Sequence, residues 1–512
     1  MKTLQAQHST FWLSRRIFLL VLGLVFLIAF TSLWTQLNGL IGSRGISPAA
    51  EFLSWAGDQL GWKSRLEIPT LLWISSSDWL LHGLCAAGVA LSSALILNLA
   101  PRWTLLLLWI SYLSLTSVGD VFLQFQWDNL LLECGLFAIF LAPSGLRPAL
   151  AAERPPNRVA LWLMRWLLFK LMMLSGLVKL WSGDPAWRDL TALRFHYWTQ
   201  PLPTRLSYYI HQLPPALHTA CTLAMFAIEI AVPFLIFGPR RARLVAAAVL
   251  ALFQLAIAAT GNYGFFNLLT LALCVLLVDD AVWLRLLPQP LRERAMIASA
   301  ARDARELPGE PARWRQVATA AAAALVVLVS VAEMRFWRRE LPSPVEAVLQ
   351  LLQPFRSINT YGLFAVMTTT RPEIQIDGSD DGESWLAYEF KWKPGKLERP
   401  SEFMAPHMPR LDWQMWFAAL GSCARNPWFV RFEKRLLEGT PEVVKLLDHN
   451  PFSANPPRYI RSTRYQYRFA EWGEQRRRDL FWEREKVGLY CPTLTLQDGR
   501  LVAVNAGALE EH

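Results

Sequence analysis

The chain has 512 residues, of which 53% are hydrophobic and 12% aromatic, and its formal net charge is +10. One soluble core of this length needs far less apolar surface, so the composition excludes an ordinary soluble protein and predicts an integral membrane protein. The motifs Gly-x-Ser-x-Gly, Walker, dinucleotide-binding and His-Glu-x-x-His do not occur, so hydrolase, ATPase and metalloprotease functions lack their usual signatures. No Cys/His spacing predicts a metal site.

Nine apolar runs approach or exceed the roughly 20 residues that a helix needs to cross a membrane. Their backbone must be helical, because unpaired peptide groups are costly in hydrocarbon. The expected spans lie near residues 16–37, 71–99, 103–118, 121–142, 160–181, 216–238, 243–260, 264–287 and 316–334. The third and fourth are the weakest, because "TSVGDVFLQFQWDNLLLE" carries charges, and they could instead form one broken or re-entrant element.

Basic residues predict the orientation of the chain, because short loops rich in Lys and Arg stay in the cytoplasm. Lys2, Arg15 and Arg16 place the amino terminus there, and the basic loops after the fourth, sixth and eighth spans agree. An odd number of spans then puts everything after about residue 335 outside the cytoplasm, on the same side as loops 38–70 and 183–215. The first span could instead be a signal peptide, although its removal would disturb this charge pattern.

The sequence therefore predicts a polytopic α-helical membrane bundle over residues 1–335 and a soluble α+β extracytoplasmic domain over residues 336–512. In the latter, "PEIQIDGSDDGESWLAYEFKWKPG" predicts a hairpin and "TRYQYRFA" a further strand, for three to five strands in all. "RLDWQMWFAALG" and "NPWFVRFEKRLLEGTPEVVKLLDHNP" have helical spacing.

The six cysteines fall into two groups. Cys423 and Cys491 lie in the predicted soluble domain, where the compartment permits a disulfide but nothing in the sequence fixes their distance. The others lie in expected spans, where we interpret them as small buried side chains. They are Cys85, Cys134, Cys221 and Cys274.

Several long motifs occur in a characteristic order. They are "NGLIGSRGISP", "FQWDNLLLECGLFAIFLAP", "KLMMLSGLVKLWSGDPAWRDLTALRFHYWTQPLPTRLSYYIHQLP", "NYGFFNLLTLALCVLLVDD" and "QPFRSINTYGLFAVMTTTRPEIQIDGSDDGESWLAYEFKWKPG". Together, over about residues 12 to 470, they strongly resemble the lipase maturation factor family.

The resemblance implies a multi-span protein that helps secreted homodimeric lipases, such as lipoprotein lipase, to reach an active fold. In animals the family resides in the endoplasmic reticulum, and its carboxy-terminal domain is associated with lipase binding. That domain corresponds here to roughly residues 340–510, and no catalytic residue or cofactor comes with the resemblance. The chain has no Asn-x-Ser/Thr sequon and no Lys-Asp-Glu-Leu-type ending, which favours a bacterial member in the inner membrane with its domain in the periplasm.

The loop 183–215 combines charges with aromatic rings between two expected spans. Its charged residues could pair and hold the loop against the soluble domain, while its rings lie at the interface. Alternatively, the loop frames a pocket whose polar groups are His196 and His211. The candidate residues are Asp184, Trp187, Arg188, Asp189, His196, Tyr197, Gln200 and His211. Asn262 and Tyr263, in the "GNYG" turn, are expected on the same side.

Charged residues inside the expected spans are a second candidate group, because such charges are costly unless paired. Lys170 and Lys179 should lie on opposite helix faces, with Lys179 reaching the interface. Partners expected for Lys170 are Asp128, Glu133 and Glu229. Asp128 and Glu133 do not share a helical face, which argues against a two-carboxylate acid/base site.

We expect a membrane-anchored maturation or chaperone-like factor that acts on a secreted client, by resemblance a lipase, without covalent chemistry. Membrane lipids are the other expected partners, and nucleic acid is not. An alternative is an integral membrane enzyme in which Lys170, nearby carboxylates and the His196 loop act on a lipid or quinone-like molecule. A transporter would show internal repeats, and none is evident.

Overall fold

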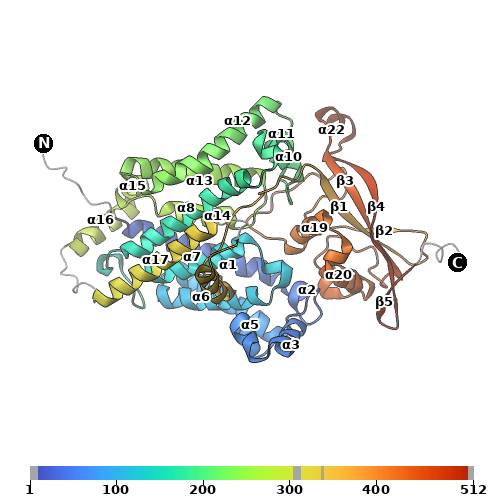
Figure 1. Cartoon of the computed structure of the whole chain (residues 1–512), viewed down its shortest axis with the longest axis horizontal. Helices are drawn as coiled ribbons and strands as arrows, with labels where there is room; N and C mark the ends of the chain where they lie inside the picture. Colours follow the sequence, from blue (N-terminus) through green and yellow to red (C-terminus); the bar gives the residue numbers. More distant parts are fainter. Residues whose placement is uncertain (1–9, 304–312, 336–339, 505–512) are drawn as a thin grey trace.

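A computed structural model describes residues 10–303, 313–335 and 340–504. Long helices form one end of the molecule, and a five-stranded sheet with its own helices forms the other (Figure 1). Lys2 and part of the basic stretch 285–315 lie outside the described residues.

The long helices follow the apolar runs of the sequence. They are α1 (Trp12–Trp34), α5 (Asp78–Ile96), α6 (Pro101–Ser117), α7 (Gln126–Leu141), α8 (Arg158–Trp181), α12 (Pro215–Phe226), α13 (Arg240–Thr260), α14 (Phe266–Val275) and α17 (Arg313–Arg335). Shorter helices connect them: α2 (Leu37–Ile41), α3 (Ala49–Leu60), α4 (Ser64–Glu67), α9 (Pro185–Arg188), α10 (Ala192–Thr199), α11 (Arg205–His211), α15 (Asp280–Leu286), α16 (Gln289–Asp303) and α18 (Ser343–Leu352). A π-helical turn, η5 (Ala227–Ala231), and a 3-10 helix, η6 (Val232–Phe237), continue α12.

Within the described residues, six helices are long and apolar enough to cross a membrane, or seven if one bent pair is counted. The predicted count of nine is therefore not confirmed. The expected span 264–287 is interrupted, because α14 and α15 meet at an angle of 110°. The two weak spans correspond to α6 and α7, which have only 17 and 16 residues.

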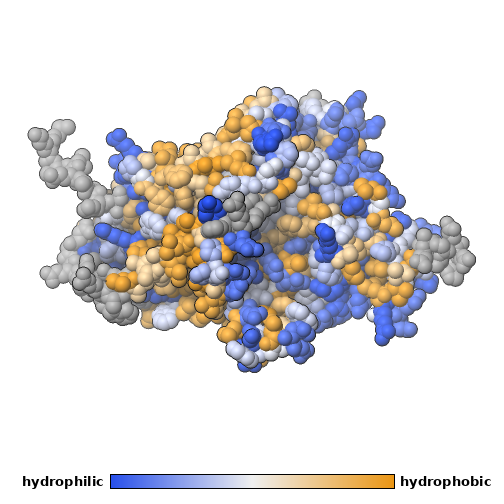
Figure 2. Space-filling view, viewed as in Figure 1, coloured by the Kyte–Doolittle hydropathy of each residue, from blue (hydrophilic) through white to orange (hydrophobic). Residues whose placement is uncertain are grey.

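The helices differ strongly in how much of their surface they bury. In the apolar window of α8, 78% of the residues are buried inside the protein, compared with 28% in α13 and 17% in α17. Exposed Leu252 and Leu255 on α13 and Leu328 on α17 contribute to an apolar outer surface around the helices (Figure 2). Helix α8 is thus central, whereas α13 and α17 present apolar side chains outward, as helices in contact with lipid do.

The sheet is antiparallel, with strand order β2-β1-β3-β4-β5. Its strands are β1 (Arg371–Ser379), β2 (Leu386–Tyr388), β3 (Tyr459–Phe469), β4 (Trp482–Gln497) and β5 (Arg500–Ala503). The hairpin and the further strand predicted from the sequence are β1–β2 and β3, and the predicted helices are α19 (Arg410–Leu420), α20 (Pro427–Leu437) and α21 (Pro441–Val444). Helix α22 (Trp472–Arg478) was not predicted.

The structure joins Cys423 to Cys491, with a Cα–Cα separation of 5.4 Å. The bond connects the 3-10 helix η8 (Cys423–Arg425), just before α20, to strand β4. Cys85, Cys134 and Cys274 are buried as expected, but Cys221 is exposed on α12. The expectation for Cys221 was wrong because it lies on an outward face of its helix.

Candidate functional site

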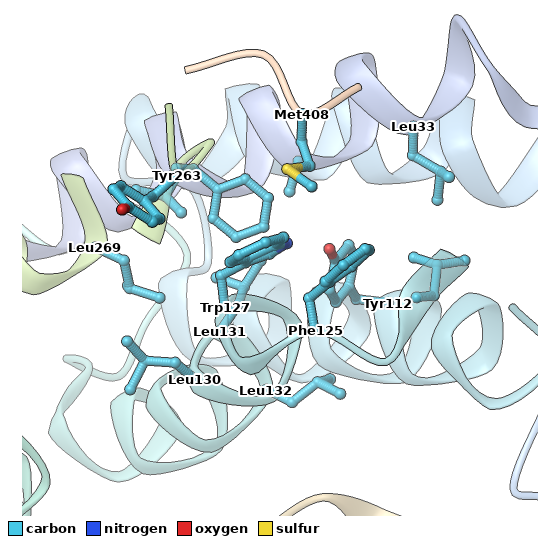
Figure 3. Close-up of a cluster of buried hydrophobic side chains, with 14 of the residues drawn as sticks. Leu33, Tyr112, Phe125, Trp127, Leu130, Leu131, Leu132, Tyr263, Leu269 and Met408 are labelled. Atoms are coloured by element: carbon cyan, nitrogen blue, oxygen red, sulfur yellow. The ribbon is translucent and has the colours of Figure 1, made fainter. Parts of the chain in front are cut away.

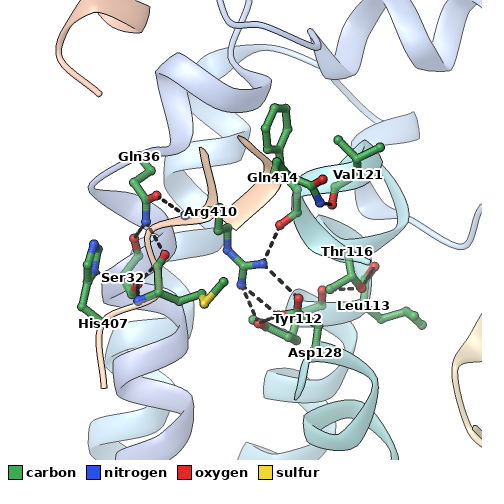
Figure 4. Close-up of polar contacts among 12 residues, drawn as sticks. Ser32, Gln36, Tyr112, Leu113, Thr116, Val121, Asp128, His407, Arg410 and Gln414 are labelled. Carbon is green, nitrogen blue, oxygen red and sulfur yellow. Dashed lines mark hydrogen bonds and ion pairs between the residues drawn. The ribbon is translucent and has the colours of Figure 1, made fainter. Parts of the chain in front are cut away.

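The helical bundle and the sheet region meet at a fully buried ion pair. Arg410, the first residue of α19, donates two hydrogen bonds to the carboxylate of Asp128 on α7, at 2.9 and 2.8 Å. Its guanidinium also donates to the Phe122 carbonyl at 2.6 Å, and the Tyr112 hydroxyl donates to Asp128 at 2.5 Å (Figure 4). Both charged side chains are at most 1% exposed. Such bidentate pairing satisfies the carboxylate and the guanidinium together.

The end of α1 holds the backbone that leads into α19. The Ser32 hydroxyl accepts from the Met408 N–H at 2.9 Å and contacts His407 Nδ1 at 2.9 Å. Gln36 accepts from the Arg410 N–H and donates to the Met408 carbonyl, each at 2.9 Å (Figure 4). Ser32 of α1 and Gln36, just beyond its end, thus position the residue that pairs with Asp128.

Aromatic packing surrounds this polar contact. The ring of Trp127 stacks on Phe125 at 4.5 Å and meets Trp413 of α19 edge-on at 4.8 Å. Met408 lies over the same cluster of buried side chains (Figure 3). A Cβ atom at Gly264, whose φ is +56°, would lie 3.2 Å from the Met408 sulfur, so this close approach requires glycine.

A second buried ion pair lies further along α7. Lys170 of α8 donates to Glu133 at 2.5 Å, and both side chains are at most 1% exposed. Glu133 also accepts from the Tyr361 hydroxyl at 2.6 Å and from the Asn359 amide at 3.1 Å. Of the three partners expected for Lys170, the structure shows Glu133. Because Lys170 is closed in this pair, the enzyme hypothesis loses its main support.

Lys179 does not reach the interface, contrary to our expectation. It is 6% exposed and donates to both oxygens of Glu229, at 2.7 and 2.6 Å. Its ammonium also lies 5.3 Å from the centre of the Trp187 ring. Glu229 sits in the π-helical turn η5, a type of irregularity that is frequent at functional positions. The two lysines of α8 therefore reach different neighbours, as opposite helix faces require.

The first half of the loop 183–215 is attached to the segment before β1. Asp184 caps α9 by accepting from the Ala186 N–H at 2.8 Å, and it also accepts from the Met367 N–H. The indole of Trp187, 2% exposed, donates to the Phe364 carbonyl at 2.9 Å. The hydrogen bonds of the Asp184 carboxylate and of the Trp187 indole, rather than ion pairs, therefore hold the loop.

The expected ion network of this loop does not form. Among the residues that the structure describes, the one ion pair of Arg188 and Asp189 is with each other, at 3.9 Å, and their side chains are 84% and 62% exposed. Arg194 instead approaches the Thr219 hydroxyl at 3.5 Å. The prediction failed because Arg188, Asp189 and Arg194 are exposed to solvent and Asp184 caps a helix.

His196 packs against the ring of Phe364, 4.8 Å away, and its Nε2 lies 3.3 Å from the Tyr263 hydroxyl. That hydroxyl donates to Gln200 at 2.8 Å, so Tyr263 bridges two candidate residues. Burial, with a smaller contribution from Lys179, lowers the pKa of His196 from 6.5 to about 4. His196 is therefore neutral near pH 7, and no partner for its Nδ1 is found in the described part of the chain.

His211, the other histidine expected at this site, packs elsewhere. Its ring lies 5.7 Å from that of Phe469 on β3 and 6.4 Å from that of Trp198. Burial and His218 lower its pKa to about 4. Tyr197 is 8% exposed, and its ring lies beside that of His218 at a tilt. Burial raises the pKa of Tyr197 to about 12. In the structure the two histidines contact different clusters of side chains. That they frame one pocket together is not shown by these contacts and remains a prediction.

Arg371, which was not predicted, and Asn262, which was expected on the same side as the loop, fix the loop to the sheet region. Arg371 of β1 is fully buried and donates to the carbonyls of Trp198, Gln200 and Pro201. Asn262 donates to the carbonyls of Leu202 at 3.3 Å, Pro203 at 3.2 Å and Glu402 at 2.9 Å, and it accepts from the N–H groups of Met404 at 2.9 Å and Ala405 at 3.1 Å. The "GNYG" turn thus holds residues 402–405 directly.

No direct signal for Arg371 and Arg410 exists in the sequence, because a lone arginine in a soluble domain does not reveal a partner in the bundle. Tyr361 and Asn359, which contact Glu133, lie within the stretch "QPFRSINTYG". That polar run was the available signal in the sequence for these two residues. Within the described ranges, no group of three or more His, Cys, Asp or Glu residues could hold a metal ion. The arrangement is suited to rigid attachment of the sheet region to the bundle.

Comparisons with known proteins agree with this architecture. The family model for the lipase maturation factor transmembrane domain matches residues 13–285, and that for the lipase maturation factor C-terminal domain matches residues 357–492. Human lipase maturation factor 2 is 38% identical, covering 96% of this chain and 84% of the relative. The mouse protein of that name is 37% identical, with 95% and 84% covered, and human lipase maturation factor 1 is 36% identical, with 96% and 89% covered. No solved structure matches. The chain is an integral membrane protein that belongs to the lipase maturation factor family.

Proposed function

We propose that this protein is a membrane-anchored maturation factor whose sheet region assists the folding or assembly of a secreted lipase. The relatives are named for lipase maturation, and family membership covers both parts of the chain. The observation that carries the proposal is the buried Asp128–Arg410 pair. It fixes residues 410–420 on the bundle, so a client bound to the sheet region would be held at a defined position above the membrane.

We further propose nine crossings, with the short helices α6 and α7 included. Contacts at their ends support this. The start of α6 lies beside the end of α7, where Arg102 donates to the Ala142 carbonyl at 3.1 Å. The end of α6 leads to residues 121–122, whose carbonyls accept from Gln414 and Arg410 of α19. Each of these helices thus runs between the end of the bundle at the sheet region and the opposite end.

Nine crossings with a cytoplasmic amino terminus would put residues 336–512 outside the cytoplasm, with loops 38–70 and 183–215. Contacts between these parts support the shared side. Arg431 of α20 donates to the Ile46 carbonyl at 3.0 Å, and Arg435 donates to the Gly45 carbonyl at 2.9 Å. In a bacterial host the compartment would be the periplasm and the client a bacterial lipase. In a eukaryotic host it would be the lumen of the endoplasmic reticulum.

A deletion strain that exports a lipase reporter tests the proposal. We expect deletion to lower lipase activity per mass of exported enzyme, and the wild-type gene to restore it. Arg410→Ala should restore little, whereas Arg468→Ala should restore it fully. Arg468 is the matched control because its salt bridge to Glu483 is exposed, with 71% of the Arg468 side chain accessible. Unchanged specific activity after deletion, across several exported lipases, would refute the proposal.

A further inference from the structure

A lobe formed by residues 43–79 lies beside the bundle, near the sheet region. Its two ends are tied together, because the N–H and the hydroxyl of Ser43 donate to the carboxylate of Asp78 at 2.7 and 2.6 Å. The lobe contains α3, the 3-10 helix η1 (Gly61–Lys63), α4 and the 3-10 helix η2 (Leu71–Trp73). Figure 1 shows α3 at the lower edge of the molecule, between the long helices and the sheet region. The lobe thus extends sideways from the bundle at the point where α5 begins.

Several large apolar side chains of the lobe are exposed. Ile74 and Trp79 are 82% and 81% exposed, the highest values for large apolar residues in the described part of the chain. Single exposed apolar residues are ordinary, but a concentration of them marks an interaction surface. The exposed large apolar residues between positions 61 and 79 are named here the apolar strip, and they are Trp62, Leu66, Leu71, Ile74 and Trp79.

Hydrogen bonds to the bundle fix the backbone that carries the strip. The Thr70 hydroxyl donates to the Ser114 carbonyl of α6 at 2.9 Å, and the Ser114 hydroxyl accepts from the Leu71 N–H at 3.1 Å. Trp62 and Leu66, four positions apart, lie on the continuous helical turns of η1 and α4 and so project to the same side. The strip is therefore presented by ordered structure that is attached to the bundle.

The strip continues the outer surface of a membrane span. Trp79 lies in the first turn of α5, which is one of the helices long and apolar enough to cross a membrane, and only 33% of the apolar window of α5 is buried. The end of such a helix lies where hydrocarbon meets the lipid headgroups, and Trp side chains are enriched at that depth. Residues 62–74 come just before this end, in a lobe that extends sideways. The strip therefore extends the lipid-facing surface of α5 along the plane of the membrane.

Two cations of the lobe fit the same surroundings. Lys63 and Arg65 are exposed and lie between Trp62 and Leu66 in the sequence. In segments that lie on a membrane, apolar side chains enter the lipid while Lys and Arg reach the phosphates of the headgroups. The segment from η1 to α4 has both kinds of side chain, so its charges complement a phospholipid surface.

We propose that residues 61–79 lie in the membrane interface and bind phospholipid, with the apolar strip inserted between the headgroups and the upper parts of the acyl chains. The occupant of this surface is the leaflet on the side of the sheet region. The inference does not rest on the lipase role, because it follows from the span α5 and from the lobe alone.

Lipid bound at the strip also affects the sheet region, because the lobe contacts that region. Arg431 and Arg435 of α20 donate to backbone carbonyls of the lobe at 3.0 and 2.9 Å. Just before the lobe, a Cβ atom at Gly39 of α2 would lie 2.5 Å from the Glu442 carbonyl oxygen of α21, so only glycine permits this approach. The lobe thus connects the membrane surface to α20 and α21, and lipid at the strip holds the sheet region at a fixed tilt.

Photocrosslinking tests the inference on the unchanged protein. The full chain is placed, one copy per disc, in phosphatidylcholine nanodiscs that contain some lipid with a diazirine near the top of one acyl chain. We expect mass spectrometry to find crosslinked lipid on peptides that cover residues 61–74, in addition to peptides of the spans. Lipid on the spans alone overturns the inference. Discs with one copy ensure that a second copy of the chain does not cover the strip.

Fluorescent labels measure how deeply the strip is inserted. In a Cys221→Ser background, where the other free cysteines are buried, a fluorophore is attached at Leu66→Cys, at Ile74→Cys or, as a control, at Asp58→Cys on the exposed side of α3. Helices in the interface bury their apolar face about 5–10 Å deep, so a nitroxide near the lipid headgroup should quench the two strip labels more than a nitroxide at the chain end. The label at Asp58→Cys should be quenched weakly by both. Equally weak quenching at all three positions overturns the inference.

A variant of the strip separates lipid from a protein partner. Trp62→Ser/Leu66→Ser/Ile74→Ser should lose most of the lipid crosslinks on residues 61–74 and keep the thermal midpoint of the wild type in detergent. Leu386→Ser is the matched control, because Leu386 is 52% exposed on β2, and it should keep these crosslinks. If the strip carries no lipid but crosslinks to an exported lipase, it binds the client and the inference is wrong, while the proposed maturation role stands.

Discussion

Asp128 of α7 and Arg410 of α19 are 282 residues apart in the sequence, yet they form a bidentate ion pair in which neither side chain is more than 1% exposed. Breaking such a pair leaves an uncompensated buried charge. Arg410→Ala should therefore lower the free energy of unfolding by about 3–5 kcal/mol. The measurement is denaturant unfolding in detergent, followed by tryptophan fluorescence.

A double replacement distinguishes an unpaired charge from lost packing. Asp128→Leu with Arg410→Met should recover most of the stability, because apolar residues of similar volume can replace a buried pair at little cost. The exposed pair provides the control, and Arg468→Ala should change stability by no more than about 1 kcal/mol. If the double variant were as unstable as Arg410→Ala, lost packing rather than the orphaned carboxylate would be the cause.

Two glycines of α5 give a matched test of the packing between α1 and α5. A Cβ at Gly88 would lie 2.3 Å from the ring of Phe30, whereas a Cβ at Gly83 would meet nothing within 4 Å. Gly88→Ala should destabilise the bundle by about 1–3 kcal/mol through overpacking. Gly83→Ala should stabilise it by about 0.5–1 kcal/mol, because alanine is the better helix former. Thermal midpoints that shift equally would contradict this packing.

The buried histidines predict a loss of stability in acid. The folded-state pKa of His196 is about 4, below its ordinary 6.5, so between these values the unfolded chain binds more protons. The stability that neutral His196 contributes is complete above pH 6.5 and is lost as the pH falls towards 4. His196→Gln should make the thermal midpoint less sensitive to pH in this window. His211→Gln should add to the effect, since the pKa of His211 is also about 4. A variant with an unchanged pH profile would show that His196 protonates freely in the fold.

Asn262 should control how firmly residues 402–405 are held. Asn262→Ala leaves the N–H groups of Met404 and Ala405 without their acceptor, at a cost of about 1–3 kcal/mol for each group left buried and unpaired. We expect faster proteolysis and faster hydrogen exchange in this segment. Asn450→Ala is the control, because in the described part of the chain the side chain of Asn450 bonds with Phe452 in its own turn. If residues 402–405 were equally protected from proteolysis and hydrogen exchange in both variants, Asn262 would not be what holds this segment.

Local patterns predicted much of the fold. The alternation around "DGSDDGE" gave the β1–β2 hairpin, and the apolar runs gave α1, α5, α8 and α13. The length of an apolar run predicted an unbroken span where the chain in fact bends. Between α14 and α15 the chain turns by 110°, which hydropathy does not report. The sequence predicted a carboxylate partner for Lys170, because costly charges in a bundle require partners, and one of the three expected acids, Glu133, pairs with it.

Pairing across the two parts of the chain could not be predicted. Lys179 was expected at the interface because its position near a helix end permits it, yet Glu229 holds it inside. Arg410 resembles any arginine at the start of a soluble helix, and only the three-dimensional structure reveals Asp128 opposite. Similarly, the distance between Cys423 and Cys491 depends on the packing of α20 against β4.

The order in which a ribosome delivers this chain determines when the Asp128–Arg410 pair can form. Helix α7 is synthesised long before α19, so Asp128 lacks its arginine partner until then. A chain that ends before α19 would leave the buried Asp128 without the guanidinium that pairs with it in the folded protein. The ion pair is therefore a contact that a finished chain has and that a fragment ending before Arg410 lacks.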